Sequence, residues 1–213
     1  PVMDLAGGCF WPRPNVDSAV VKIDNNGKYI GVAPVAGKGI ESFTGITACK
    51  DGGVVIVGKS NSSDSGNTES TFVSDLASRG GFDAYIIKFN NDLSRSFAKP
   101  FRGQYDDDLV DVVEKSDGTF VATGKSNSSS RDLKGITTRG GDDMVIASFD
   151  EYGNLSWARS FGGTQNESAT AICLAEKDGY VIAGRTLSKD IDMKGISQYV
   201  NGKSVGVIAK FPE

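Results

Sequence analysis

The sequence predicts an all-β fold built from repeated four-stranded antiparallel sheets, and three observations lead to this prediction. Similar segments recur along the 213 residues at steps of 60 to 66 positions. Each copy contains apolar runs rich in Val and Ile, which have the length of strands and are too short for amphipathic helices. Short polar turns separate many of these runs, as expected for strands that are joined in hairpins.

Three columns of residues define the repeat. The first column pairs a glycine with an acid four positions later, at Gly37 and Glu41, Gly103 and Asp107, and Gly163 and Glu167. The second column is a glycine that follows an apolar run, at Gly58, Gly124 and Gly184. The third column is an apolar run that ends at Ile23, Phe89, Phe149 and Phe211. Because the columns advance together, by 66 and then 60 positions, they indicate true internal repetition.

Each unit is predicted to hold four strands in an antiparallel meander. The first strands are expected at 46–48, 109–114 and 169–175, and the fourth at 29–32, 95–98 and 155–159. The second and third strands are the apolar runs of the second and third columns. Asp-Gly pairs at 51–52, 117–118 and 178–179 are expected to turn the chain between first and second strands. The chain is interpreted as one domain, 1–213, with units at about 24–89, 90–149 and 150–211, and with 1–23 as the end of a preceding unit.

Sheets that are apolar on both faces cannot bury themselves, so copies of the same sheet must cover them. Radial stacking of four-stranded sheets gives a β-propeller, and we therefore expect a partial ring of about three blades. A parallel β-helix is the alternative, although its coils are shorter and lack Asp-Gly hairpins. Because a closed propeller has at least about four blades, additional blades are expected from a longer parent chain or from a second copy in a homodimer.

Composition excludes several classes of function. The chain has no histidine, which removes the commonest general base and metal ligand. Its net charge is −4 and its basic residues are scattered, which argues against a nucleic-acid partner. No apolar run approaches the length of about 18 residues that spans a membrane. Cys9, Cys49 and Cys173 are widely spaced, so we expect neither a zinc site nor a disulfide framework, but buried or half-buried thiols.

One segment carries a family resemblance. Residues 140–163 contain Gly-Gly-x-Asp, an apolar strand, Asp-x-x-Gly-x-x-x-Trp, and then Gly-Gly followed by an acid. This pattern resembles the repeat of bacterial surface and secreted β-propeller proteins, and the resemblance covers nearly the whole chain. It departs at Phe97 and Gly31, which stand where Trp157 stands, and at Arg102, which replaces a glycine. The resemblance implies an extracellular or cell-surface location and a role in adhesion or carbohydrate binding.

The long loops are the expected ligand-binding region. Antiparallel order places the loops at 60–82, 126–142 and 186–203 on one end of the sheets, and long loops on a rigid scaffold are where binding residues usually lie. We expect a non-catalytic module that binds a glycan or a protein there. The candidate side chains are Asn61, Asp64, Asn127, Arg131, Asp190 and Asp192. Two alternatives are that they only satisfy their own backbone, or that they hold calcium through their oxygens, although no EF-hand pattern is present.

The repeated acids Glu41, Asp107 and Glu167 have two interpretations. Paired carboxylates are the catalytic groups of most glycosidases, so a glycan-active propeller enzyme is one alternative. However, each acid occupies the same place in its unit, which favours a turn role in which the carboxylate accepts backbone N–H groups. We therefore predict no catalytic residue and no cofactor, with a ligand-free structural spacer as the remaining alternative.

Overall fold

The structure is a computed structural model that describes residues 2–3, 9–10, 18–63, 76–175, 179–196 and 202–212. Within these ranges the chain is all-β, as predicted, with antiparallel sheets, short 3-10 turns and no α-helix. The predicted antiparallel meander is present in full in two four-stranded sheets. No helix in these ranges has the length and apolar character needed to cross a membrane.

The strands follow one another in five sheets. The first two sheets are β1 (Val2–Met3) with β2 (Cys9–Phe10), and β3 (Ser18–Ile23) with β4 (Tyr29–Val35). The first four-stranded sheet holds β5 (Glu41–Ala48), β6 (Val54–Ser60), β7 (Asp83–Phe89) and β8 (Arg95–Phe101). The second holds β9 (Asp107–Glu114), β10 (Phe120–Ser126), β11 (Asp143–Phe149) and β12 (Leu155–Phe161). The last described sheet holds β13 (Glu167–Leu174), β14 (Tyr180–Thr186) and β15 (Val205–Phe211).

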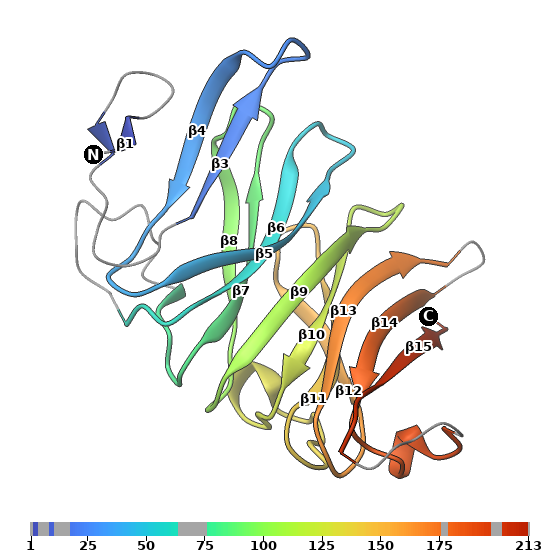
Figure 1. The fold of residues 1–213 in the computed structure, drawn as a ribbon. Helices are drawn as coiled ribbons and strands as arrows, with labels where there is room; N and C mark the ends of the chain where they lie inside the picture. Colours follow the sequence, from blue (N-terminus) through green and yellow to red (C-terminus); the bar gives the residue numbers. More distant parts are fainter. Residues whose placement is uncertain are drawn as a thin grey trace.

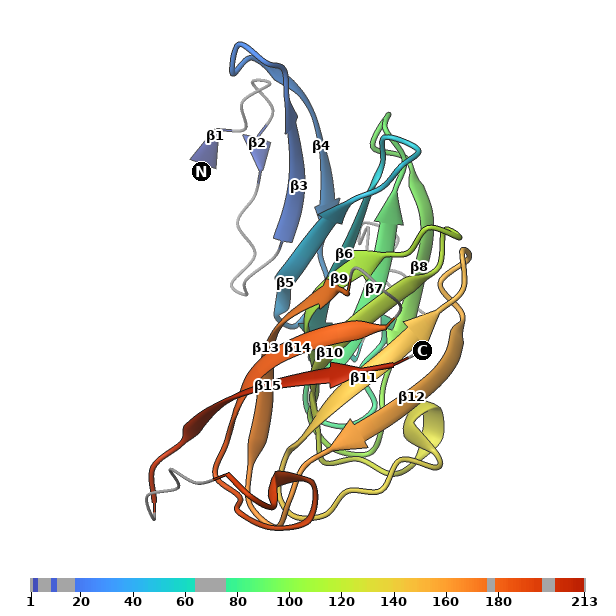
Figure 2. The same ribbon diagram turned by 90° about the vertical axis from the view of Figure 1, so that its right-hand side faces the viewer.

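The sheets lie face to face and succeed one another along an arc (Figure 1). The first strands β5, β9 and β13 are neighbours on the inner side of this arc, whereas β8 and β12 lie on the outer side (Figures 1 and 2). Within the described residues no sheet closes on itself. The arrangement places the turns between first and second strands at one end, and the long loops at the other.

The inner and outer strands are longer than expected. The first strands begin at Glu41, Asp107 and Glu167, which is five, two and two residues before the predicted starts. The polar residues at these starts look like loop in the sequence, but they pair with the ends of the second strands, as Glu41 does with Ser60. Each of the larger sheets therefore begins at its repeated acid, and the fourth strand of each four-stranded sheet falls in the next sequence unit.

The shared glycine of the second column allows two strands to approach closely. A Cβ atom at Gly58, Gly124 or Gly184 would lie 2.3, 1.8 or 2.6 Å from the carbonyl oxygen of Ser42, Asp108 or Ser168. Each close approach lies next to a register shift in the pairing of first and second strands. Glycine is needed here because a side chain would collide with backbone that cannot move aside.

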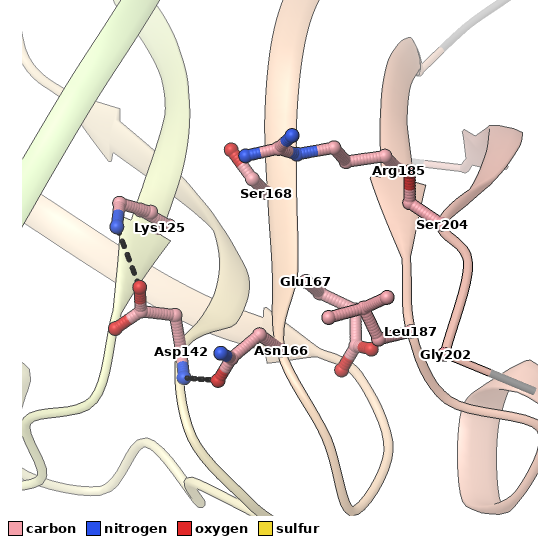
Figure 3. A pocket seen from close by; sticks show the side chains of 9 residues that line it. All are labelled: Lys125, Asp142, Asn166, Glu167, Ser168, Arg185, Leu187, Gly202 and Ser204. Carbon is pink, nitrogen blue, oxygen red and sulfur yellow. Dashed lines mark hydrogen bonds and ion pairs between the residues drawn. The ribbon is translucent and has the colours of Figure 1, made fainter.

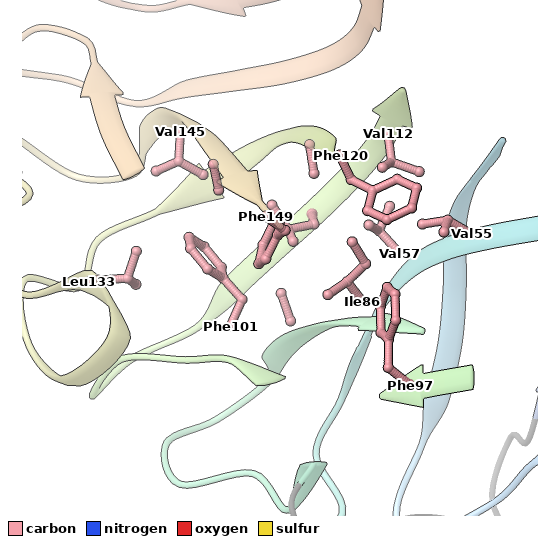
Figure 4. Packing of buried hydrophobic residues seen from close by; sticks show 14 of the residues in the cluster. Val55, Val57, Ile86, Phe97, Phe101, Val112, Phe120, Leu133, Val145 and Phe149 are labelled. Atoms are coloured by element: carbon pink, nitrogen blue, oxygen red, sulfur yellow. The ribbon is translucent and has the colours of Figure 1, made fainter. Parts of the chain in front are cut away.

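Apolar side chains fill the space between the two four-stranded sheets (Figure 4). Ile86 of β7 and Phe101 of β8 contribute from one sheet, and Phe120 and Phe149 from the next. The ring centroids of Phe101 and Phe149 are 6.1 Å apart in an edge-to-face arrangement. Each fully buried side chain of this size contributes about 2 to 3 kcal/mol, so packing between sheets is a main source of stability.

The cysteines differ in their environments. Cys49 is buried and free, and burial raises the pKa of its thiol to about 11. Cys173 is also free but is exposed, so the expectation of buried or half-buried thiols is wrong for this residue. The position of Cys173 in the repeat is that of Val113, which packs against the next sheet. Cys173 is exposed because no described sheet covers that face of β13. The side chain of Cys9 lies outside the described part of the structure.

Candidate binding site at the long-loop end

The three repeated acids are buried and bind the loops around them. The carboxylate of Glu41 accepts hydrogen bonds from Gly37 N at 2.6 Å and Ser60 Oγ at 2.8 Å, and from Ser62 Oγ. Each acid thus joins the turn before its strand to the end of the second strand of the same sheet. The equivalent donors are Gly103 N and Ser126 Oγ for Asp107, and Gly163 N and Thr186 Oγ1 for Glu167.

A second set of buried acids begins the third strands. Asp83 and Asp143 each accept the backbone N–H of a residue four positions earlier, and each leaves its Oδ1 buried without a hydrogen-bond partner. Burial, with the nearby charge of Glu167 as a further cause, raises the pKa of Asp143 to about 6. Oδ1 of Asp143 and Oε2 of Glu167 both border Gly162, at 1.9 and 2.6 Å from where a Cβ atom would lie. Two carboxylates from neighbouring sheets therefore converge at this turn.

The candidates from the third long loop contact the connection that precedes their own sheet. Asp190 accepts hydrogen bonds from Thr164 N at 2.9 Å and Thr164 Oγ1 at 2.6 Å. Asp192 accepts the backbone N–H of Gly162 at 3.1 Å and lies 3.3 Å from Arg139 Nη2. These carboxylates are engaged in holding the long loop against the turn beneath it.

The remaining candidates are scattered. Asn61 Oδ1 accepts the backbone N–H of Ile40 at 2.7 Å. Asn127 leaves its Oδ1 buried without a partner, and Arg131 is exposed in the short turn η2 (Arg131–Leu133) with φ at +58°. Asp64 lies outside the described residues. Across the described ranges no group of three or more Cys, Asp or Glu side chains is arranged to hold a metal ion.

A polar pocket lies at the same end, between the second and third of the larger sheets (Figure 3). Its volume is about 370 Å³. It brings together the ends of second strands, the starts of first strands and the long loops. The repeated acid Glu167 lines it, whereas none of the ligand-face candidates in the described ranges does. The lining residues are Lys125, Asp142, Asn166, Glu167, Ser168, Arg185, Leu187, Gly202 and Ser204.

The charges in the pocket are only partly paired. Lys125 Nζ lies 2.5 Å from Asp142 Oδ2, and Asn166 Oδ1 accepts the backbone N–H of Asp142 at 3.0 Å. The carboxylate of Glu167 is directed to its turn, as described above. Arg185 is exposed and forms no ion pair with any residue in the described ranges, and its guanidinium extends toward Ser168 (Figure 3). The pocket therefore offers one uncompensated cation beside hydroxyl and amide groups.

Two residue exchanges distinguish this junction from the preceding one. Between the two four-stranded sheets, Lys59 Nζ contacts Asp108 Oδ2 of the next sheet and lies 5.7 Å from the centre of the Phe82 ring. At the following junction Ser168 stands at the position of Asp108, and Asp142 stands at that of Phe82. The shorter serine leaves space where an aspartate would reach across to the neighbouring lysine.

Sequence reasoning missed this pocket because it searched the long loops alone. A usable signal was present in the repeat, since Ser168 and Asp142 differ in type from Asp108 and Phe82, which occupy the same positions one unit earlier. No protein-family model matches the chain, and no curated protein sequence is significantly similar to it. Function is therefore argued from the geometry of the pocket.

Proposed function

We propose that this chain is a non-catalytic binding module of a bacterial surface or secreted protein, and that its sheets are blades of a β-propeller. The stacking of four-stranded meanders with their first strands on the inner side supports the propeller arrangement. The family resemblance supports the location. The ligand is a glycan that enters the pocket at the long-loop end.

The pocket supports a glycan with an acidic substituent. Arg185 presents a planar fork of donors that matches a carboxylate or sulfate in two parallel hydrogen bonds. Asn166, Ser168 and Ser204 add polar groups that suit sugar hydroxyls. The observation that carries the proposal is Arg185, which has no ion-pair partner among the described residues, beside these groups in a pocket of about 370 Å³.

The acids of the pocket favour binding over catalysis. A glycosidase needs two carboxyl groups that face the substrate, one of which exchanges a proton with it. Asp142 is paired with Lys125, and Glu167 accepts hydrogen bonds from Gly163 and Thr186. Glu167 also repeats Glu41 and Asp107 in position and contacts, which suits a structural role.

The test is a glycan array that contains acidic glycans and their neutral counterparts, followed by calorimetric titration of any glycan that binds. Replacing Arg185 by Ala should weaken acidic-glycan binding by about ten- to a hundred-fold, the value of a charged hydrogen bond. Ser168→Asp should also abolish binding, because the new carboxylate would fill the pocket and pair with Lys125. The matched control is Ser42→Asp, which makes the same change at the equivalent position of the first four-stranded sheet.

Three results would count against the proposal. An array with no binding overturns a glycan ligand, and binding that survives both Arg185→Ala and Ser168→Asp overturns the pocket as its site. Hydrolysis of a bound glycan would overturn the non-catalytic assignment in favour of a propeller enzyme.

A further inference from the structure

The stack of sheets ends in two apolar faces that no described residue packs against fully. We call the surface of Ala19, Val21 and Ile23 on β3 the leading face, and the surface of Cys173, Val181 and Ile208 on the last sheet the trailing face. The three residues of the leading face alternate along β3 with half-buried residues that point to the other side. Residues of β15 alternate in the same way, with Ile208 on the more exposed side.

Internal junctions reveal what these two faces are built to contact. Every sheet has a trailing side, which corresponds in the repeat to the trailing face, and a leading side opposite to it. Val55 and Ile86 lie on the trailing side of the first four-stranded sheet. They pack in one cluster with Phe120 and Phe149, which lie on the leading side of the next sheet. Val121 and Ile146 repeat this arrangement one sheet later, in a cluster with Ile172 and Ile182. Every internal junction between the larger sheets is thus made by one trailing side and one leading side.

The repeat shows how much apolar surface the two outer faces leave in water. Ile208 is 78% exposed, whereas Ile86 and Ile146 at the same repeat position are 0% and 2% exposed. Ile23 is 58% exposed, against 3% for Phe89 and 0% for Phe149. The two faces therefore have the sequence character of internal junctions, and within the described ranges no further sheet covers them as the internal junctions are covered.

We propose that the trailing face of one copy of this chain binds the leading face of a second copy, head to tail. The contact would continue the series of internal junctions, with Ile208 placed as Ile86 and Ile146 are placed now. This inference does not depend on the proposed ligand.

Charge favours head-to-tail contact over contact between like faces. Lys210 is exposed on the trailing side, at the repeat position of Lys88. Lys88 lies 5.8 Å from the centre of the Phe120 ring of the following sheet. Two trailing faces placed together would bring Lys210 against its own copy, and like charges brought together in this way repel.

The experiment measures the mass of the 213-residue chain by light scattering over a wide concentration range. The unchanged chain should associate to at least twice the 22.5 kDa of one copy. Ile208→Glu, which blocks the trailing face, and Val21→Glu/Ile23→Glu, which blocks the leading face, should each be monomeric. A mixture of these two variants retains one intact face of each kind and should form a one-to-one complex. Tyr152→Glu is the matched control, because Tyr152 is exposed in the turn between β11 and β12, away from both faces, and its change should leave association intact.

Thiol modification provides a second readout. Cys173 lies on the trailing face, so association should slow its alkylation, and Ile208→Glu should restore the rate. A chain that is monomeric at every concentration overturns the proposal. So does a Val21→Glu/Ile23→Glu variant that still dimerises alone, because that result requires contact between like faces. Circular dichroism that matches the unchanged chain verifies that each variant is folded.

Discussion

Lys59 Nζ lies 2.7 Å from Asp108 Oδ2 across a sheet junction, although Asp108 pairs in register with Lys125 of its own sheet. Lys125 lies 2.5 Å from Asp142 instead, in the loop that precedes its neighbouring strand. Lys59 and Lys125 occupy the same position in the repeat. An acid of the next sheet neutralises Lys59, whereas an acid that precedes a strand of the same sheet neutralises Lys125. The pocket exists because of this change of partner.

Asp108→Ser gives the first of these junctions the serine of the second, and should destabilise the protein by about 1 to 2 kcal/mol, because a partly buried lysine loses its partner. Adding Phe82→Asp supplies the acid that Asp142 provides to Lys125, and should recover at least half of the loss. Urea unfolding of the two variants and of Phe82→Asp alone gives the free energy of unfolding of each, and hence the coupling energy between positions 82 and 108. Simple additivity of the two changes would contradict this account of the junction.

Asp143→Asn should stabilise the protein at pH 7 by roughly 1 to 3 kcal/mol. An amide at this position carries no charge and can donate a hydrogen bond toward Glu167, whereas Asp143 leaves its Oδ1 buried without a partner. Thermal unfolding at pH 7 measures the gain. Asp142→Asn is the contrasting variant, because it removes the acid that pairs with Lys125 and should give no such gain.

Stability should fall as the pH rises from about 4 to about 6.5 through the titration of Asp143 and Asp107. Burial raises the pKa of each carboxyl to about 6, with Glu167 and Asp83 as the respective nearby charges. Because the native state holds these protons more tightly than the unfolded state, their contribution is complete below the unfolded pKa and is lost above the native pKa. Comparing the unfolding free energies of the unchanged chain and of Asp143→Asn across this pH range isolates the contribution of the Asp143 carboxyl. A difference that stays constant with pH would refute the titration of this group.

Asp107→Ala should destabilise the protein by about 2 to 4 kcal/mol, because it leaves buried donors without an acceptor. Those donors are Gly103 N and Ser126 Oγ, both 2.5 Å from the carboxylate. Asp106→Ala is the control, since Asp106 is exposed and accepts one backbone N–H, and it should cost less than about 1 kcal/mol. Equal losses for the two variants would argue against a special role for the buried acid.

Gly124→Ala should be among the most damaging single-methyl changes in the chain, at roughly 2 kcal/mol or more. The added Cβ would lie 1.8 Å from the carbonyl oxygen of Asp108, so the first and second strands would have to separate. Gly206→Ala adds the same methyl to β15, where no atom lies within 4 Å, and should be neutral or slightly stabilising. Thermal unfolding of the Gly124→Ala and Gly206→Ala variants tests whether the close approach of two strands explains why glycine recurs at this repeat position.

The strands were predictable because the apolar runs that form them are local and recur in register. The sequence identified the apolar parts of β6, β7, β10 and β11 and the turns that join the strands. It placed the start of β9 too late, since Asp107 and Asp108 resemble loop residues until their pairing with Ser126 and Lys125 is seen. Polar strand ends depend on tertiary contacts that no local pattern reveals.

The pocket was not predictable from composition or from any one loop. Its residues come from two sheets, and its space arises from the difference in length between Ser168 and Asp108 at equivalent positions. The loop acids Asp190 and Asp192 were more conspicuous in the sequence, yet their oxygens contact Thr164 and Gly162. Polar loops on a repeat scaffold must first satisfy the backbone of their own connections, so a polar loop alone is weak guidance to a ligand site.

The carboxylate of Glu41 accepts hydrogen bonds from the hydroxyl groups of Ser60 and Ser62, 19 and 21 residues along the chain. The network around each repeated acid is therefore built largely within one sheet and its loops, whereas other polar contacts, such as Lys59 with Asp108 and Asp111 with the backbone N–H of Ile172, cross between sheets. A unit that is copied or deleted within a gene would keep the carboxylate network of its own acid, and the polar contacts at its two junctions would change. This local network also means that folding can nucleate in any sheet and spread outward from it, as in a one-dimensional chain of coupled elements.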